Sequence, residues 1–460
     1  MSFRRTPDQV LSRPRNPVFL FQPLAGWTPA FAGVTTRLTS YDFTILRISE
    51  VLLRMERFIM EILNSPIRIG NRVAPNRIVN QPMEGNDADE KGNPTELTFA
   101  RYRNLAQGGA GVIVVEALTI TQESRARKNQ LGLYAETAPA LERLVKEMKG
   151  INDKPLILFQ ITHSGQQSGA GFSRLVSVYP LPGQETHILT EEEIEKIGDD
   201  FARAALLAKQ VGADGIDFKQ CHGYLCAEIL RPVNTRKDRF GGSFKNRTRF
   251  FSETADKIKK AVGSGSFLLG ARFSIYEGIP GGFGTAGPEE VIEDLQEPLS
   301  FARLMENSGF HYINVSAGIP AITPEVVRPT KLYPEGIYRH FGWTRAVKKA
   351  VSVPVIGSAY SYLRDGKNDL KDSDPGRKNF LYWAEKNLRE GVGDLVGIGR
   401  QSLADPLFAG KILSGKGAEI RYCLACGGCS VLLRSQAQTG CPIYFDYYKK
   451  LLKEVQKTGK

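Results

Sequence analysis

The stretch VGADGIDFKQCHGYL occupies residues 211–225. Its Gly-Ala pair is typical of the end of a helix. The run GIDFK at 215–219 then predicts a buried strand, which passes directly into the polar residues 220–224. The order is helix end, buried strand and polar loop, and this order is the repeating unit of a parallel sheet covered by helices.

The same order recurs along the chain. Gly-Gly-Ala at 108–110 and Gly-Val-Gly at 391–393 also stand between a helical pattern and an apolar run. Eight strands are predicted, at 77–82, 111–117, 155–161, 215–219, 267–273, 312–315, 353–357 and 394–398. Helices are predicted at 95–107, 137–149, 190–211, 246–261, 288–308, 340–350, 377–390 and 403–413. Eight such units close a (β/α)8 TIM barrel.

An open doubly wound sheet is the alternative for this pattern. That fold carries a Gly-x-Gly-x-x-Gly turn after its first strand, whereas Pro82-Met83-Glu84-Gly85-Asn86 stands here without that spacing. The sequence therefore favours the barrel. The alternating run IRIGNRV at 67–73 turns at Gly-Asn and predicts a hairpin, which we expect to close the bottom of the barrel.

The first part of the chain differs in composition from the rest. Residues 1–40 are rich in arginine and proline and contain one acid, Asp8. A targeting segment, a disordered tail and translated upstream sequence are the three interpretations. The last is favoured because Met60 directly precedes the first fold-like residues. The expected organisation is an N-terminal extension over 1–59, the barrel over 60–420, and a cysteine-rich segment with a C-terminal helix over 421–460.

Composition excludes several classes of protein. The chain contains no run of about 18 apolar residues that would span a membrane. Six cysteines in 460 residues are too few for a disulfide scaffold, so a reducing, cytoplasmic location is expected. The net charge is +12, but no block of five like charges occurs, and a basic enzyme is favoured over a nucleic-acid-binding protein.

The polar loop at 220–224 supplies the first candidate site residues. In a (β/α)8 barrel the chemistry lies at the carboxyl ends of the strands. Lys219 and His222 can both face this mouth, where they would offer two donors to one substrate oxygen. Tyr224 is a candidate proton donor because a phenol is neutral at pH 7. Cys221 has no partner base in view and is not favoured as a nucleophile.

Arginine and small residues end three other strands. Arg272 needs an anionic partner or a ligand at the mouth, and an internal ion pair with Glu84 or Asp217 is the structural alternative. Small residues after the seventh and eighth strands let backbone N–H groups approach a phosphate, and an arginine adds charge there. The residues concerned are Gly357, Ser358, Gly399 and Arg400.

Four of the six cysteines lie within residues 423–441. Cys423, Cys426 and Cys429 are spaced by two residues each, and Cys441-Pro442 follows after eleven. Three such thiolates and a fourth before proline are typical of an iron–sulfur cluster. A zinc site is the alternative, but zinc sites more often use two separated Cys-x2-Cys pairs.

These motifs together resemble the old yellow enzyme family. The resemblance runs from about residue 65 to 442 and is closest to its longer branch, which includes 2,4-dienoyl-CoA reductase and trimethylamine dehydrogenase. Its most specific parts are residues 212–225, the pattern RPxNxRxDRFGGS at 231–243, and Asn246-Arg247. The family fold is a TIM barrel that binds FMN.

The resemblance implies roles for individual residues. Pro82 and Met83 match the segment under the flavin, Gln160 the residue that binds its pyrimidine, and Arg272 the residue near flavin N1. Gly399 and Arg400 match the phosphate clamp. Tyr224 matches the proton donor and His222 one member of the pair that holds the substrate oxygen. The positions that match the ligands of a 4Fe–4S cluster are Cys423, Cys426, Cys429 and Cys441.

This sequence departs from the family pattern at several positions. Lys219 stands where many members have histidine, so a more anionic substrate oxygen is expected. Gln166 replaces a common arginine, and Ala359 replaces a common glycine of the phosphate loop. The cysteine spacing is x2-x2-x11 rather than x2-x3-x11, which affects the expected type of cluster. The chain ends at 460 without a second nucleotide-binding motif, which favours a separate electron-transfer partner.

The resemblance implies an FMN-dependent oxidoreductase. The expected reaction is reduction of an activated C=C bond of a small molecule, with NADH or NADPH as reductant and Tyr224 as proton donor. Two alternatives are an amine or alcohol dehydrogenase that passes electrons through the cluster to a partner protein, and a non-catalytic electron-transfer flavoprotein. A homo-oligomer is compatible with the sequence, and neither nucleic acid nor membrane is expected as a partner.

Overall fold

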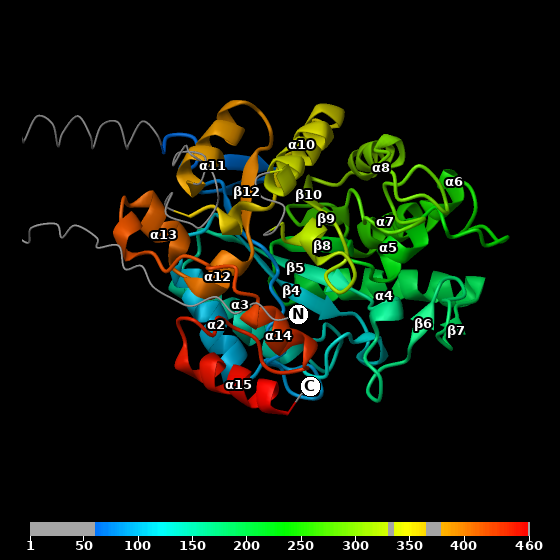
Figure 1. Ribbon diagram of the computed structural model, residues 1–460, viewed down its shortest axis with the longest axis horizontal. Helices are drawn as coiled ribbons and strands as arrows, with labels where there is room; N and C mark the ends of the chain where they lie inside the picture. Colours follow the sequence, from blue (N-terminus) through cyan, green and yellow to red (C-terminus); the bar gives the residue numbers. More distant parts are fainter. Residues whose placement is uncertain (1–59, 330–334, 365–378, 459–460) are drawn as a thin grey trace, which may run out of the picture. The chain divides into compact units, whose positions relative to one another are not determined.

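The computed structural model describes residues 60–329, 335–364 and 379–458 (Figure 1). Residues 1–59 lie outside the described residues, and the three interpretations of that segment stay untested. The first two residues of the helix predicted at 377–390 also lie outside them. Within the described ranges, no helix is both long and apolar enough to cross a membrane.

Eight parallel strands close into a barrel, as the sequence predicts. Each strand pairs in parallel with its neighbours, and the last returns to the first. The strands are β3 (Ile78–Asn80), β4 (Val112–Thr119), β5 (Leu156–Thr162), β8 (Gly215–Gln220), β9 (Leu268–Ser274), β10 (Tyr312–Ser316), β11 (Val355–Gly357) and β12 (Leu395–Ile398). All residues of β4, β5 and β8 are buried, because helices cover one face and the barrel interior covers the other.

Helices surround the strands in chain order (Figure 1). The longer ones are α2 (Glu96–Gln107), α3 (Ala138–Ile151), α4 (Glu191–Gln210), α7 (Arg249–Val262), α8 (Gln296–Asn307), α10 (Glu335–Ala350), α11 (Phe380–Arg389) and α15 (Asp446–Lys457). Short helices are α5 (Leu225–Leu230), α6 (Phe244–Arg247), α9 (Pro324–Val327), α12 (Arg400–Ala404), α13 (Phe408–Leu413) and α14 (Gly428–Arg434). A two-stranded ribbon of β6 (Val176–Ser177) and β7 (His187–Ile188) lies before α4.

Local sequence explains where α4 begins and ends. The backbone of Glu193 donates to the Thr190 hydroxyl at 3.2 Å, and the Glu193 carboxylate accepts from the Thr190 backbone at 2.9 Å. This capping box satisfies two backbone donors at the start of the helix. Gly212 has φ +89°, a left-handed conformation that glycine adopts without strain, and it turns the chain into β8.

Two predicted helices are too long, and proline is the physical reason in both. The helix predicted at 288–308 begins at Gln296, which places Pro298 in its first turn. Further into a helix, proline would remove a hydrogen bond and clash with the preceding turn. The segment predicted at 403–413 divides into α12 and α13, with Pro406 between them.

The predicted hairpin closes the bottom of the barrel. Strands β1 (Ile67–Ile69) and β2 (Arg72–Ala74) pair antiparallel. Ile69 and Ala74 are buried in one apolar cluster with residues from the amino-terminal ends of the barrel strands, including Val112, Leu156 and Leu268. The plug therefore excludes water from the end of the barrel that carries no candidate site residues.

The C-terminal segment packs against the opposite end of the barrel. The Thr439 amide donates to the Gly85 carbonyl at 2.7 Å, and the Cys423 amide donates to the Gln401 side chain at 2.9 Å. Cys423 and Cys441 share a small apolar cluster with Leu403. The cysteine-bearing segment is thereby held at the carboxyl ends of the strands.

Candidate functional site

A cavity of about 300 Å³ lies at the mouth of the barrel. Residues from the ends of β3, β5, β8, β9, β10 and β12 line it, together with residues of α9, α10 and α14. The predicted site residues that line this cavity are Pro82, Met83, Gln160, Lys219, His222, Tyr224, Arg272, Ser358, Gly399 and Arg400. Gly357 is the last residue of β11 and does not line the cavity.

Glu84 is the centre of the polar contacts in this cavity. Its Oε1 accepts a hydrogen bond from the Tyr224 hydroxyl at 2.8 Å and lies 3.5 Å from Lys219 Nζ. Its Oε2 lies 3.2 Å from Arg127 Nε. From the sequence, Glu84 is expected only as a partner for Arg272, and Arg127 is not predicted at all.

The charges around Glu84 set the protonation of the pair it forms with Tyr224. Burial by itself raises the pKa of Glu84, but Lys219 and Arg127 outweigh burial and leave the pKa below its usual value. Burial and the charge of Glu84 hold the pKa of the Tyr224 phenol well above its usual value. At neutral pH the structure therefore pairs an ionised carboxylate with a protonated phenol.

Lys219 lies close to both the Glu84 carboxylate and the Tyr224 ring. Its Nζ is 3.4 Å from the centroid of the Tyr224 ring. Burial lowers the pKa of Lys219, and Glu84 opposes that shift. A buried ammonium needs such a partner, so Glu84 explains how a lysine is tolerated at this position.

His222 is held by two serines and is neutral. Its Nε2 lies 2.8 Å from the Ser316 hydroxyl, and its backbone N–H donates to Ser274 at 3.0 Å. Its φ of +66° is in the left-handed region, which directs the chain toward Tyr224. Burial and the nearby cations Arg272 and Lys219 hold the pKa of His222 well below its usual value.

Arg272 forms no ion pair with Glu84 or Asp217 in the described part of the chain. It donates to the Ser316 hydroxyl at 3.3 Å, and its Nε is buried with no partner among the described residues. A buried donor without an acceptor is costly, so this nitrogen suits a ligand in the cavity. Gln160 donates to Asp217 at 2.8 Å, and this bond fixes its amide at the floor of the same cavity.

Small residues allow close packing against Met83 and at the ends of β11 and β12. A Cβ at Gly399 would lie 3.1 Å from Met83 Sδ, tighter than ordinary contact. Ser358 donates its hydroxyl to the Val315 carbonyl at 2.7 Å. Ala359 has φ +77°, which glycine would adopt without strain. The backbone here follows the left-handed path even though the sequence carries alanine.

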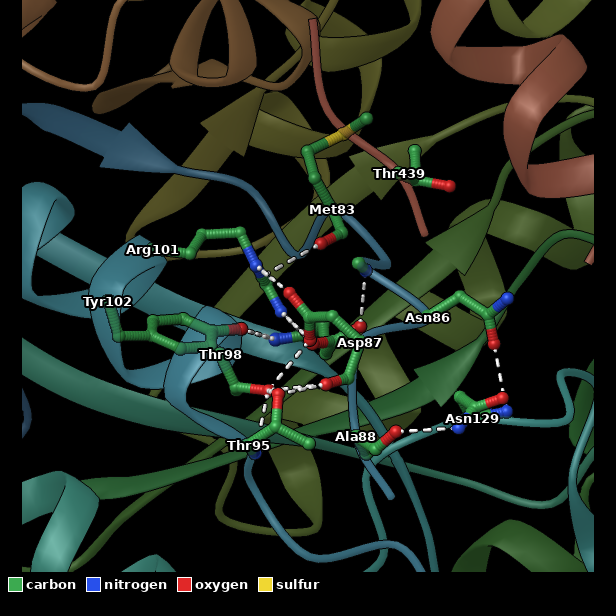
Figure 2. Close-up of polar contacts among 12 residues, drawn as sticks. Met83, Asn86, Asp87, Ala88, Thr95, Thr98, Arg101, Tyr102, Asn129 and Thr439 are labelled. Carbon is green, nitrogen blue, oxygen red and sulfur yellow. Dashed lines mark hydrogen bonds and ion pairs between the residues drawn. The ribbon is translucent and has the colours of Figure 1, made fainter. Parts of the chain in front are cut away.

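A buried ion network positions the segment that carries Met83 and Glu84 (Figure 2). Arg101 on α2 contacts Asp87 through two nitrogens, each 2.9 Å from a carboxylate oxygen, and also pairs with Glu116. The Gly85 amide donates to Glu116 at 2.6 Å. A Cβ at Gly85 would clash with Arg101 Nη2, so glycine allows this close approach. Burial raises the pKa of Glu116 to about 7, although Arg101 lowers it.

The four predicted cluster ligands meet around a second, smaller cavity. Cys423, Cys426, Cys429 and Cys441 all line it, together with Arg400, and all four are free thiols. Cys429 and Arg400 also line the large cavity, so the two cavities adjoin. Across the described ranges, no three His, Cys, Asp or Glu side chains are arranged to hold one metal ion.

Of the site residues that the sequence does not predict, Glu84 alone has a signal in its position. It lies four residues after the end of β3, where the rule for barrel mouths places site residues. Arg127 lies in an irregular loop after β4. Arg328 directly follows the short helix α9, and Arg434 is the last residue of the short helix α14. No periodicity marks such loop residues.

Comparisons with known proteins identify the family and agree with the barrel fold. The model of the NADH:flavin oxidoreductase / NADH oxidase family matches residues 62–373. An NADH oxidase from Thermoanaerobacter brockii is 33% identical over 377 residues, which cover 79% of this chain and 52% of that protein. An NADPH dehydrogenase from Listeria welshimeri is 31% identical over 361 residues, which cover 76% of this chain and 94% of that protein.

A solved structure adds a likeness in three dimensions. A 2-naphthoyl-CoA reductase in complex with 2-naphthoyl-CoA has a TM-score of 0.69 and 25% identity, covering 83% of this chain and 57% of that one. The chain thus spans about half the length of the NADH oxidase and somewhat more of the naphthoyl-CoA reductase.

Proposed function

Because the chain belongs to the NADH:flavin oxidoreductase / NADH oxidase family, which is the old yellow enzyme family, we propose that it is an FMN-dependent reductase of activated C=C bonds. The reductant is NADH or NADPH. The observation that carries this proposal is the position of the Tyr224 phenol, which lines the mouth cavity with Lys219 Nζ 3.4 Å from the centroid of its ring. Burial and Glu84 hold the pKa of this phenol well above its usual value. A neutral phenol next to a cation is suited to protonate a developing carbanion.

The residues around the cavity fit FMN. The unpartnered Nε of Arg272 and the amide of Gln160 would hold the flavin ring, and Ser358 and Arg400 would hold the phosphate. Met83 and Gly399 line the same cavity, which would accommodate the ring system. When bound, FMN supplies the hydride chemistry that no amino-acid side chain offers.

Tyr224 supplies the proton that completes the reduction. The reaction adds a hydride equivalent to one alkene carbon and a proton to the other. In the structure the phenol proton points to Glu84 Oε1, so the hydroxyl turns from Glu84 to the substrate carbon when substrate is bound. Loss of the proton leaves a phenolate. Lys219 stabilises that negative charge, because its Nζ lies 3.4 Å from the centroid of the Tyr224 ring.

Lys219 and His222 are proposed to hold the substrate oxygen. Both line the cavity, but each has a protein partner in the structure, Glu84 and Ser316 respectively. A substrate oxygen that binds both residues must therefore replace or share the contacts that they make with Glu84 and Ser316. A neutral His222 offers one ring N–H and Lys219 offers an ammonium, so the pair favours an oxygen that gains negative charge.

The charge of the cavity disfavours the amine dehydrogenase alternative. Lining residues include six cations and one carboxylate, namely Arg127, Lys219, Arg272, Arg328, Arg400, Arg434 and Glu84. A protonated amine would be repelled by this excess of positive charge. The non-catalytic alternative predicts that no alkene is reduced. The test is therefore conversion of 2-cyclohexen-1-one to cyclohexanone by the FMN-loaded protein with NADH or NADPH, and absence of product would refute the proposal.

We also propose that Cys423, Cys426, Cys429 and Cys441 hold a 4Fe–4S cluster. Their placement around one cavity supports this, and the Ala425 amide donates to Cys423 Sγ at 3.4 Å, a contact that would stabilise a thiolate. A single zinc ion needs all its sulfurs about 2.3 Å from one point, whereas a cubane spreads them over four irons. A cluster beside the cavity would allow a partner protein to exchange electrons.

Replacing both Cys426 and Cys429 with alanine is expected to remove the cluster and leave FMN binding intact. Protein purified without oxygen should contain about four iron and four sulfide per chain, falling below about one in the variant. The matched control is Cys226→Ala, which changes a buried thiol away from this cavity. One zinc per chain without sulfide would instead assign a zinc site.

A further inference from the structure

Two cations at the rim of the mouth cavity are not accounted for by the proposed reaction. Arg127 and Lys219 both contact Glu84. Arg272 and Arg400 have proposed roles toward FMN, and Arg400 also faces the cysteines. Arg328 and Arg434 remain, and within the described residues neither belongs to an ion pair.

Arg328 and Arg434 are held near each other despite their like charge. Arg328 follows α9 and donates to the Pro320 carbonyl at 3.2 Å and to the Ser430 hydroxyl on α14. Arg434 ends the same short helix, α14, and is exposed. Burial and the charges of Arg400 and Arg434 lower the pKa of Arg328. The three arginines therefore repel one another electrostatically.

Little negative charge from the described residues faces the two arginines. Burial lowers the pKa of His340 to about 4, so this neighbour on α10 adds no charge at neutral pH. Glu325 on α9 partly offsets the repulsion on Arg328, but it does not line the cavity. Among the described residues, Glu84 is the one carboxylate in the cavity lining, and three other side chains already contact it. The apolar residues of this part of the lining include Ala321, Val327 and Leu433.

We propose that Arg328 and Arg434, with the Ser430 hydroxyl that Arg328 contacts, form a subsite for an anionic group of the substrate, a carboxylate or phosphate. This inference rests on the proposed function and names the class of alkene that the site selects. Two guanidinium groups bind such an anion through charge-assisted hydrogen bonds. Arg434 is exposed, so an anion can reach this subsite from solvent while the alkene lies deeper, near Tyr224.

The test compares two ligands that differ in one charge. One is a saturated cyclohexanone that bears a carboxylate on a short alkyl chain, and the other is its methyl ester. Binding to the FMN-loaded protein is measured by calorimetry, so the result does not depend on turnover. The carboxylate is expected to bind at least about tenfold more tightly than the ester, and the Arg328→Gln/Arg434→Gln variant should bring this ratio close to one.

Two controls establish whether the arginines act on the ligand or on the cofactors. Arg303→Gln removes an exposed charge on α8, outside the cavity, and should leave the ratio unchanged. FMN and iron contents of the double variant should equal those of the parent. A loss of FMN or iron with an unchanged ligand ratio would assign the arginines to the cofactors and overturn the inference. Failure to reduce 2-cyclohexen-1-one would refute the proposed function without altering the binding ratio.

Discussion

Replacing Tyr224 with phenylalanine is expected to slow alkene reduction by about 10²- to 10⁴-fold, the usual contribution of a general acid. Reduction of bound FMN by NADH or NADPH should proceed at the parent rate, because that step needs no proton from the phenol. Stopped-flow absorbance, with the two half-reactions followed separately and without oxygen, measures both rates. An equal loss of rate in FMN reduction and in alkene reduction would show that Tyr224 supports the structure of the cavity and does not supply the proton.

The Glu84→Gln variant distinguishes the proton donor from its surroundings. Glutamine retains an oxygen that can accept from Tyr224 but removes the charge that raises the pKa of the phenol. The phenol should therefore ionise at lower pH than in the parent, and alkene reduction should begin to fall at correspondingly lower pH. An unchanged pH profile would contradict the assigned coupling between Glu84 and Tyr224.

Replacing Arg101 with methionine is expected to lower the free energy of unfolding by about 3–5 kcal/mol. The substitution leaves Asp87 and Glu116, each about 1% exposed, without the cation that both contact. Figure 2 shows Arg101 beside Asp87. Breaking a buried pair in this way costs more than losing its attraction, since a carboxylate left without its cation either stays desolvated as an ion or must take up a proton. Urea unfolding at a fixed FMN concentration measures the loss.

A matched control lies on the same helix. Arg103 pairs with Glu96 and Glu147, but its side chain is 35% exposed and that of Glu96 is 76% exposed. Exposed ion pairs contribute about 1 kcal/mol or less to stability. Arg103→Met should therefore lower the free energy of unfolding far less than Arg101→Met. Equal losses in the two variants would contradict the view that burial makes the Arg101 network important.

The barrel could be predicted from sequence because its strands and helix ends have local signals. Buried runs such as GIDFK at 215–219, preceded by a glycine stop, recur at the spacing of a parallel barrel. Helix starts are harder to predict. Pro298 and Pro406 limit the helices because proline lacks a backbone N–H and its ring clashes with the preceding turn. The apolar periodicity around these prolines gives no sign of where the helix must begin or break.

The site could be predicted only in part, because its contacts join distant residues. Tyr224, His222 and Lys219 lie within one motif and are predicted together. Their partner Glu84 lies 140 residues before Tyr224 in the chain, and Ser316 lies 94 residues after His222. The carboxylate that a buried lysine contacts depends on how the strands of the barrel close. Local patterns in the sequence do not reveal which distant residues meet in this way.

The structure also accounts for one departure from the family pattern. A lysine at 219 introduces a fixed charge into a buried cavity, and such a charge requires an anion nearby. Glu84 provides it, and the two residues are therefore expected to depend on each other. Ala359 is accommodated differently, since the backbone there keeps a left-handed φ of +77° that a glycine would adopt freely.

The most direct test of the proposed reaction is an anaerobic visible spectrum of the FMN-loaded protein, recorded before and after NADH or NADPH and again after 2-cyclohexen-1-one. We expect one nucleotide to bleach the flavin band and the enone to restore it, quickly in the parent protein and slowly in Tyr224→Phe. A reduced flavin that the enone does not reoxidise, or that it reoxidises equally fast in both proteins, would contradict the assignment of this cavity as a site of alkene reduction.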